Sequence, residues 1–370
     1  MKADRRLRVL HLVEDMRTGG LERVIAALAR GTDRARFDVA VWCLSRGGEV
    51  ADALSSQGVA VRVLGMPSRF ALGFAPKLAA MLKEDGTDIV HCHGYTASTV
   101  GRAAAVLART PVIIAHQHSV YAEYSPRQLW TERLLSRFSD RVICCSQAVR
   151  DFVVGREGVS PDKAVVVYNG TDCIRHAGPQ EARRRLGLRD GEFVAGCVGS
   201  FVPNKGQANL IKAVGTLARA GRRARLVLVG DGPLRRELEE LAAEEGVDAV
   251  FTGRVDDVFA ILEAFDVLAL PSVNREGLSL ALVEGLCCGK PLLASRLQGM
   301  VEVVHDGENG LLVPPGDIAA LASALERLAS DEVLRSRLGM KSFEFYKERF
   351  TLRRMLEKVE QIYEDCLARR

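Results

Sequence analysis

Short apolar runs alternate with amphipathic segments along the whole chain of 370 residues. The runs are continuous and rich in Val, Leu and Ile, as expected for strands buried on both faces of a sheet. The segments between them, such as 21–30, 76–85 and 146–154, space their apolar residues as one helix face requires. This alternation predicts parallel sheets covered by helices. The predicted strands are 7–13, 38–44, 59–64, 88–92, 111–115, 140–144 and 164–168, followed by 193–199, 225–230, 249–253, 266–271 and 290–295.

A polar stretch with Gly and Pro at 176–180 interrupts this pattern near the middle of the chain. The chain is long enough for two domains of ordinary size. We therefore predict an α/β protein with two doubly wound, Rossmann-like domains that face each other across a ligand cleft. The expected domains are residues 1–178 and 179–350, followed by a helix at 351–370.

The composition is that of a globular protein with a mild charge. The net charge of +4 comes from 51 basic and 47 acidic residues, so it does not call for a nucleic-acid partner. Local runs of arginine at 183–185 and 222–225 are expected to be solvated surface, and a peripheral contact with an anionic membrane is left open. No window of 18 apolar residues predicts a membrane-spanning helix. Nine cysteines without a C-x-x-C spacing predict reduced thiols and a cytoplasmic location.

The segment EGLSLALVE at 276–284 is the most informative motif. If a helix begins at Leu278, its free N–H groups form a site for phosphate. Glu276 would stand beside that site, and Glu284 would lie further along the same helix. Two surface carboxylates on a helix are the alternative, but the apolar neighbours of Glu284 indicate a buried group that needs a partner such as a ribose hydroxyl pair.

Two loops offer further candidates for phosphate binding. Gly19 and Gly20 end the loop after the first strand, where glycine permits unusual dihedrals and close approach by a ligand, or simply a tight turn. Lys205 lies in a loop bounded by glycines, where it is either a point charge for phosphate or a solvated side chain. The dinucleotide fingerprint and the P-loop motif are both absent, which argues against a nicotinamide oxidoreductase.

Histidines gather at the ends of two predicted strands, in HCHG at 91–94 and AHQHS at 115–119. The two members of each pair point the same way if the strand continues. Four histidines could form a metal site, but no carboxylate lies at ligand spacing, so we expect none. We expect instead one histidine of each pair to line the cleft and the other to be packed.

Ten segments in order carry a resemblance to a known family. The chain is similar to the retaining, sugar-nucleotide-dependent glycosyltransferases of family 4 with the GT-B fold. The segments are TGGLERV (18–24), DIVHCHG (88–94), AHQHS (115–119), VICCSQAVR (142–150), VVYNGTD (166–172), VGSFVPNKG (198–206), LVLVGDGPLR (226–235), FTGRVDD (251–257), LALPSVNREGLSLALVEGLCCGKPLLAS (268–295) and NGLLVPPGD (309–317). This resemblance implies sugar transfer to a glycan or lipid-linked acceptor, in polysaccharide or glycolipid biosynthesis, with the helix 351–370 returning to the first domain.

The resemblance also implies roles for matching positions. His118 corresponds to an active-site histidine near the reacting sugar, Glu276 to the residue that contacts the sugar hydroxyls, and Glu284 to the ribose ligand. Lys205 and the amides around Gly277, Leu278, Ser279 and Leu280 would hold the diphosphate, which Gly19 and Gly20 would let the first domain approach. Members of this kind use a nucleotide-diphosphate sugar as co-substrate and need no metal. The implied catalytic residues are therefore His118, Glu276 and Lys205.

One position departs from the family pattern. Many members carry Arg where this chain has Ser200, which can donate a hydrogen bond but adds no charge to the diphosphate site. Arg254 could compensate, although its loop more often helps to hold the base. Acceptor contacts are expected in the loops 67–74 and 119–128, whose aromatic residues Phe70, Phe74, Tyr121 and Tyr124 either stack on a sugar or pack.

Three alternatives stay open beside sugar transfer. The same scaffold could catalyse sugar-nucleotide epimerisation or sugar-phosphate synthesis. The chain could also be a catalytically silent protein that only binds nucleotide sugars, which the departure at Ser200 would favour. The presence of Glu276, Glu284, Lys205 and His118 argues against the silent alternative.

Overall fold

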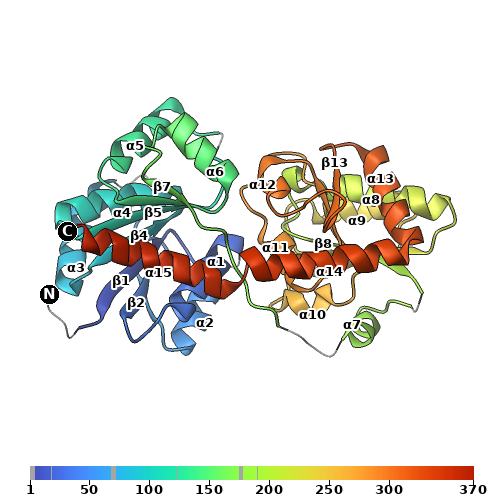
Figure 1. Ribbon diagram of the computed structural model, residues 1–370, viewed down its shortest axis with the longest axis horizontal. Coiled ribbons are helices and arrows are strands. Elements are labelled where there is room, and N and C mark those ends of the chain that lie inside the picture. The colour runs from blue at the N-terminus through green and yellow to red at the C-terminus, as the bar shows by residue number, and fades with distance from the viewer. Residues whose placement is uncertain (1–4, 18, 68–71, 122, 175–177, 190) are drawn as a thin grey trace. The chain divides into compact units, whose positions relative to one another are not determined.

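The chain folds into two compact units, one formed by residues up to 170 together with 352–370 and the other by 171–351. The computed structural model describes residues 5–17, 19–67, 72–121, 123–174, 178–189 and 191–370. The change from the first to the second unit comes at 170/171, whereas the sequence suggested 178/179, next to residues 175–177 that lie outside the described ones. The two units are described separately below (Figure 1).

The first unit is built on a parallel sheet with the order β3-β2-β1-β4-β5-β6-β7. This order reverses its direction between β1 and β4, as in a doubly wound fold. Each predicted strand of this half is present within a few residues. The strands are β1 Leu7–Val13, β2 Phe37–Cys43, β3 Ala60–Val63, β4 Ile89–His93, β5 Val112–Gln117, β6 Arg141–Cys144 and β7 Ala164–Val166.

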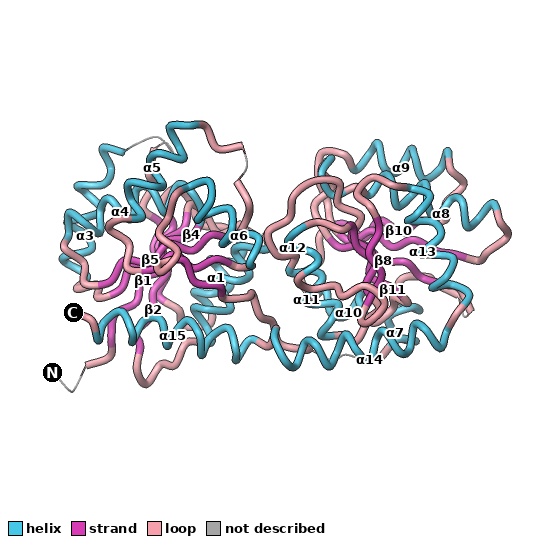
Figure 2. Tube along the Cα trace, turned by 45° about the horizontal axis from the view of Figure 1, so that its top comes forward, coloured by secondary structure: helices cyan, strands magenta, loops and turns pink. Residues whose placement is uncertain are grey.

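Helices lie on both sides of this sheet, as Figure 2 shows for the strands in magenta and the helices in cyan. One face carries a core in which Leu10 and Leu12 of β1 pack with residues of the third and fourth helices. The helical elements are α1 Gly20–Gly31, α2 Glu49–Ser56, the 3-10 turn Leu72–Phe74, α3 Ala75–Asp85, α4 Gly94–Ala108, α5 Pro126–Ser136, α6 Gln147–Phe152, a π-helical turn Val153–Glu157 and α15 Leu352–Ala368.

The C-terminal helix α15 belongs to the first unit, where it covers the sheet face opposite that core. Its apolar stripe includes Met355, Val359 and Tyr363, which are all buried. The Tyr363 ring packs edge-on against Phe37 of β2, and its hydroxyl lies 2.7 Å from Nδ1 of His91 in β4. The helix is therefore attached to the sheet by both apolar and polar contacts.

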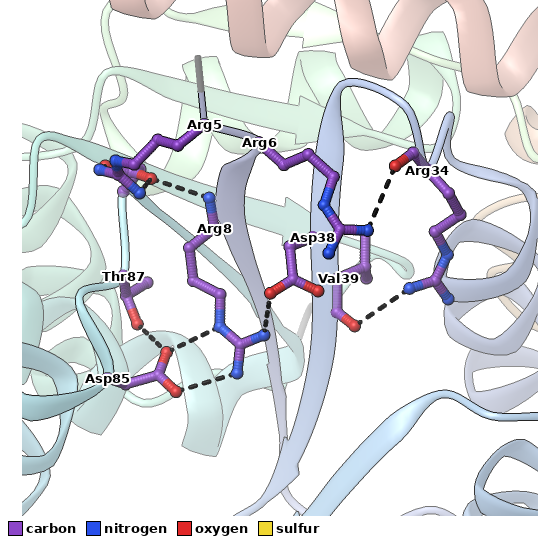
Figure 3. Close-up of polar contacts among 9 residues, drawn as sticks. Arg5, Arg6, Arg8, Arg34, Asp38, Val39, Asp85 and Thr87 are labelled. Atoms are coloured by element: carbon purple, nitrogen blue, oxygen red, sulfur yellow. Dashed lines mark hydrogen bonds and ion pairs between the residues drawn. The ribbon is translucent and has the colours of Figure 1, made fainter. Parts of the chain in front are cut away.

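Ion pairs tie the beginnings of the first strands together (Figure 3). Arg8 of β1 contacts Asp38 of β2 at 2.6 Å and Asp85 at the end of α3 at 3.0 Å. Asp85 also accepts a hydrogen bond from the Thr87 hydroxyl at 2.7 Å. These polar groups lie at the N-terminal ends of the strands, so they leave the C-terminal ends free for the residues that carry the chemistry.

The second unit repeats the doubly wound order in a parallel sheet, β10-β9-β8-β11-β12-β13. Its strands are β8 Phe193–Val198, β9 Ala224–Val229, β10 Ala249–Gly253, β11 Val267–Leu270, β12 Leu292–Ser295 and β13 Gly310–Val313. The sequence pattern does not predict β13, because the four residues from Gly310 to Val313, which Pro314 follows, are too few for a periodic signal. The helical elements are α7 Pro179–Arg185, the 3-10 turn Pro203–Lys205, α8 Gln207–Arg219, α9 Arg235–Glu244, α10 Val258–Leu262, α11 Leu280–Cys287, α12 Gln298–Val301, α13 Ile318–Ser330 and α14 Glu332–Arg349.

Composition led to two predictions, one about the cysteines and one about membrane-spanning helices. The prediction that all cysteines are reduced is wrong for Cys173 and Cys287, which form a disulfide because the fold brings these distant positions together, with Cα atoms 5.6 Å apart. The other seven cysteines are not disulfide-bonded. No helix in the described ranges combines the length and the apolar character that crossing a membrane requires.

Candidate functional site

A partly buried ion pair of the second unit forms where its sheet order reverses. The loop after β8 carries Lys205, and the loop after the neighbouring strand β11 carries Glu276. Their side chains form an ion pair, with Nζ 2.6 Å from Oε1, and the Ser272 hydroxyl donates to the same oxygen at 2.9 Å. The side chains are 26% and 11% exposed, so the pair is accessible from solvent without being fully hydrated. Ligands of doubly wound sheets bind at this switch point.

Gly206 holds these two loops together. It adopts a left-handed conformation with φ of 68°, and a Cβ atom at this position would lie 2.1 Å from the carbonyl oxygen of Pro271. The Val273 amide also donates to the Asn204 carbonyl at 2.9 Å. Only glycine allows both the backbone conformation and the close approach. The spacing of Lys205 and Glu276 is therefore set by the backbone as well as by their attraction.

The helix expected from Leu278 begins at Leu280, so that prediction is wrong by two residues. The backbone of Glu276 and Gly277 packs against Gly299, where a Cβ atom would lie 2.4 and 1.9 Å from their carbonyl oxygens. This contact keeps the segment before Ser279 out of the helix. Glu276 consequently lies in the loop after β11, before the N-cap residue Ser279.

In the described part of the chain, the first backbone N–H groups of α11 have no intrahelical acceptor. Ser279 is the N-cap residue, but its side chain makes no capping hydrogen bond. Ser279 and Leu278 are each 7% exposed, and Gly277 is also buried. Glu284, in the second turn of the helix, is 1% exposed, which confirms that it is not a surface carboxylate.

The other two predicted donor residues of this unit are exposed. Ser200 follows β8, and its carbonyl accepts a hydrogen bond from Gln207 Nε2 at 3.0 Å. Arg254 follows β10, which is the edge strand two places from β8 in the sheet. Ser200 thus stands in the same loop as Lys205, whereas Arg254 comes from a different part of the sheet edge.

The glycine pair of the first unit has an ordinary backbone. Gly19 is the N-cap of α1 with φ of −167°, and Gly20 is the first residue of the helix. Neither residue therefore uses the unusual dihedrals that glycine permits, because extended and helical conformations are open to any residue. A Cβ atom at Gly19 would meet the Glu22 side chain at 2.2 Å, whereas one at Gly20 would stand in open space. The space next to Gly20, at the start of α1, is therefore open.

The histidines of the first unit form one buried cluster on the sheet face that α15 covers. Strand alternation turns His11, His91, His93 and His116 to the side opposite the Leu10 core. In the strand register, His11 pairs with His91, and His93 pairs with His116. His91 and His93 stack at 4.3 Å between ring centroids, and His116 and His118 stack at 4.0 Å. Both pairs therefore point the same way, as predicted, and His11 joins them from β1.

Sequence reasoning missed His11 because it stands alone in an apolar strand. The parallel strand order β1-β4-β5 indicates that His11 belongs with the other histidines, because it places equivalent strand positions side by side. His11, His91, His93 and His116 are at most 1% exposed, whereas His118, just past the end of β5, is half-buried. Burial lowers the pKa of His118 to about 3, and burial with the charge of Arg34 lowers that of His11 to about 3. The cluster is therefore neutral at physiological pH.

Two groups of three histidines have ligand atoms within 4.8 Å of one another, namely His11 with His91 and His93, and His93 with His116 and His118. A metal bound by two imidazoles lies in the plane of both rings. In the second group, the near-parallel stacking of His116 on His118, 24° between planes, does not direct both lone pairs to one point. Hydrogen-bonding distances join His11 with His93, His93 with His118, and His91 with His116.

A hollow of about 520 Å³ opens next to this cluster. Among its lining residues are His93, Tyr95, Tyr121, Tyr124 and Glu22. Tyr121 and Tyr124 stack with ring centroids 5.0 Å apart. Of the four aromatic candidates, these two tyrosines therefore line a surface. Phe74 packs in the core, and Phe70 lies outside the described residues.

Comparison with known proteins covers both units. Residues 18–175 match the family described as Glycosyltransferase Family 4, and residues 192–331 match the one described as Glycosyl transferases group 1. The putative glycosyltransferase EpsD of Bacillus subtilis is 30% identical over 291 residues, which are 75% of this chain and 76% of that protein. The chain belongs to the family 4 glycosyltransferases.

One further relative supports this assignment, and a solved structure supports the fold. The UDP-Gal:alpha-D-GlcNAc-diphosphoundecaprenol alpha-1,3-galactosyltransferase of Escherichia coli is 29% identical over 272 residues, with 70% of each chain covered. The crystal structure of Anabaena HepE in complex with UDP matches with a TM-score of 0.87 and 24% identity, over 97% of this chain and all of the other. The predicted GT-B fold is thus confirmed, and this family 4 enzyme is a glycosyltransferase.

Proposed function

We propose that this glycosyltransferase moves a sugar, with retention of configuration, from a nucleotide-diphosphate sugar to a glycan or lipid-linked acceptor, as in cell-surface polysaccharide or glycolipid synthesis. The observation that carries the donor half of this proposal is the Lys205–Glu276 pair at the switch point of the second sheet, where Glu276 lies in the loop that leads to α11. HepE, which shares the fold, has been solved with UDP and with UDP-glucose. The galactosyltransferase relative is named for a lipid-linked substrate.

Donor binding exchanges the partners of the ion pair. The Lys205 ammonium leaves Glu276 for the diphosphate, which also receives the free amides from Gly277 to Leu280. Glu276 then accepts hydrogen bonds from sugar hydroxyls. Buried Glu284 accepts hydrogen bonds from the ribose hydroxyls. Positive charge for the leaving group comes from Lys205 and the helix start, so we propose that no metal is required.

The transfer step itself needs little covalent participation by the protein. In the proposed reaction the anomeric bond to the diphosphate breaks while the acceptor oxygen attacks from the same face. The departing diphosphate oxygen takes the acceptor proton. His118 of the first unit contributes a hydrogen bond at the reacting sugar. The protein therefore acts through positioning and through stabilisation of the departing negative charge.

The test uses the ion pair and a matched control pair from the same unit. Lys341 and Glu344 of α14 form an exposed ion pair at 2.7 Å, so Lys341→Met and Glu344→Gln control for loss of a charge. We expect Lys205→Met to abolish the thermal shift caused by UDP. We expect Glu276→Gln to abolish transfer while still binding UDP. Activity of both site variants close to that of the controls would overturn the assignment.

The alternatives differ in their products. With one labelled nucleotide sugar and no acceptor, an epimerase yields a second nucleotide sugar, and a silent binder yields nothing. A glycosyltransferase yields slow hydrolysis to UDP and free sugar, and addition of acceptor yields a product whose anomeric configuration is read by NMR. Inversion of that configuration would refute retention without refuting transfer.

We also propose a cytoplasmic location with a peripheral contact at the inner face of the membrane. Five arginines of the two basic runs are ion-paired, among them Arg183 with Asp266 at 2.7 Å and Arg225 with Asp248 at 2.6 Å, so those runs offer little free charge. The support comes instead from α5 and its end, where Trp130 and Phe138 are 63% and 51% exposed beside exposed arginines. Co-sedimentation with anionic vesicles that Trp130→Ser leaves unchanged would count against this surface.

A further inference from the structure

Three histidines of the first unit form a hydrogen-bonded chain that ends at His118. His11 Nδ1 lies 2.9 Å from His93 Nε2, and His93 Nδ1 lies 3.0 Å from His118 Nε2. His11 and His93 are 0% and 1% exposed. The two ends of the chain, His11 Nε2 and His118 Nδ1, are buried atoms with no hydrogen-bond partner among the described residues.

A chain of this kind can exist in only two forms. Burial lowers the pKa of all three rings, so each ring is neutral and carries one N–H. Each link needs one donor and one acceptor. Either every ring is protonated at Nδ1, which leaves an N–H at His118 Nδ1, or every ring is protonated at Nε2, which leaves a bare lone pair there. The tautomer of His118 is therefore tied to those of His93 and His11.

The environment of His11 favours the first form. With protonation at Nε2, the His11 end would hold an N–H in the protein interior without an acceptor in the described structure. Buried donors without a partner are rarer in proteins than under-satisfied acceptors. Protonation at Nδ1 leaves only an acceptor at the buried end and directs a donor to the His118 end.

We propose that His93, backed by His11, is a positioning residue that fixes His118 as a neutral Nδ1–H donor toward an oxygen of the donor substrate. The role given to His118 rests on the proposed function, whereas the tautomer does not. In this form His118 does not remove a proton from the acceptor. Its part is a hydrogen bond to a sugar hydroxyl or a diphosphate oxygen, which strengthens as negative charge develops.

The second histidine chain provides a matched control. His116 stacks on His118 at 4.0 Å, but its Nδ1 lies 3.2 Å from His91 Nε2, and His91 Nδ1 lies 2.7 Å from the Tyr363 hydroxyl. His116 is as buried as His93 and also touches the His118 ring. It makes no hydrogen bond to His118 among those of the described chain. His116→Leu therefore removes similar packing and leaves the proposed link intact.

The experiment is nitrogen NMR on the full-length protein with ¹⁵N-labelled histidine. The His118 signals are assigned as those lost in His118→Gln. In the wild-type protein we expect a protonated Nδ1 and a bare Nε2. In His93→Leu we expect His118 to move toward the Nε2–H form that free histidine favours, and in His116→Leu we expect no change of tautomer.

Kinetics then test the functional part. We expect His93→Leu to lower kcat about tenfold, the loss of roughly one oriented hydrogen bond, with KM for the nucleotide sugar nearly unchanged. His116→Leu should lower kcat less. A wild-type His118 protonated at Nε2, or equal tautomer changes in both variants, would overturn the proposal. The wild-type measurement decides it even if His93→Leu does not fold. Absence of transfer by the wild-type enzyme would refute the proposed function and leave the tautomer result standing.

Discussion

Glu157 provides a quantitative test of the polar interior of the first unit. It ends the π-helical turn Val153–Glu157 and is 1% exposed, and neither carboxyl oxygen has a partner among the described residues. Nearby, Arg102 and Glu132 form an ion pair in which both side chains are 1% exposed. Arg102 is thus already neutralised. Burial, with a smaller contribution from Glu132, raises the pKa of Glu157 from its ordinary 4.5 to about 8.

The magnitude follows from linkage between protonation and folding. Between pH 4.5 and 8 the unfolded chain loses the Glu157 proton while the folded unit keeps it. The unfolded state then binds fewer protons, so the free energy of unfolding falls as pH rises, by about 1.4 kcal/mol per pH unit. Below pH 4.5 both states are protonated and this effect is absent. The full loss above pH 8 is roughly 5 kcal/mol, a large share of the 5–15 kcal/mol typical of a domain.

Glu157→Gln removes the titrating group and keeps its shape. The difference in unfolding free energy between variant and wild type should therefore grow in favour of the variant from pH 5 to pH 8. Urea unfolding followed by tryptophan fluorescence measures this free-energy difference for the first unit, because both tryptophans, Trp42 and Trp130, belong to that unit. Glu123→Gln, at an exposed carboxyl, is the control and should show no such trend. A difference that is constant across this pH range would refute the argument.

Three further results are expected in the second unit. Ser200→Arg adds a charge beside the proposed diphosphate site and should tighten UDP binding about tenfold in calorimetry, with Ser200→Gln as the uncharged control. Gly206→Ala should destabilise the unit by about 2 kcal/mol or more in urea unfolding, because its φ of 68° is left-handed and its Cβ would lie 2.1 Å from the Pro271 oxygen. Thiol titration of the denatured protein should find seven free thiols before reduction and nine after it, since Cys173 and Cys287 are bonded, and nine before reduction would contradict the disulfide.

The strands were predictable from sequence because parallel strands buried on both faces are continuous apolar runs. β1 and β10 have the predicted limits, and most of the others shift by one or two residues. The pattern fails where tertiary contacts decide. Leu278 is apolar and precedes a helical segment, yet the packing of Gly299 on the chain before it delays α11 to Leu280. No local signal reports a contact with a glycine that lies 21 positions later in the sequence.

The candidate site was only partly predictable for a similar reason. The motifs identify Lys205 and Glu276 individually, but their ion pair depends on β8 and β11 being neighbours and on the close approach at Gly206. His11 carries no motif at all. Its place in the histidine chain follows from the register of β1 against β4, which pairs it with His91. Spacing along the sequence does not contain these cross-strand relations.

The two units share the doubly wound sheet order but differ in the charge of the polar groups at the point where that order reverses. In each unit the polar groups stand where the order reverses, at β1 and β4 in the first and at β8 and β11 in the second. In the first unit the groups are buried imidazoles that remain neutral, because a charge there would lose its hydration without gaining a counter-charge. In the second unit Lys205 and Glu276 are partly exposed and form an ion pair, so both can remain charged with a small desolvation penalty. A nucleotide diphosphate is therefore expected to find its counter-charge at Lys205 in the second unit, because the buried imidazoles of the first unit remain neutral.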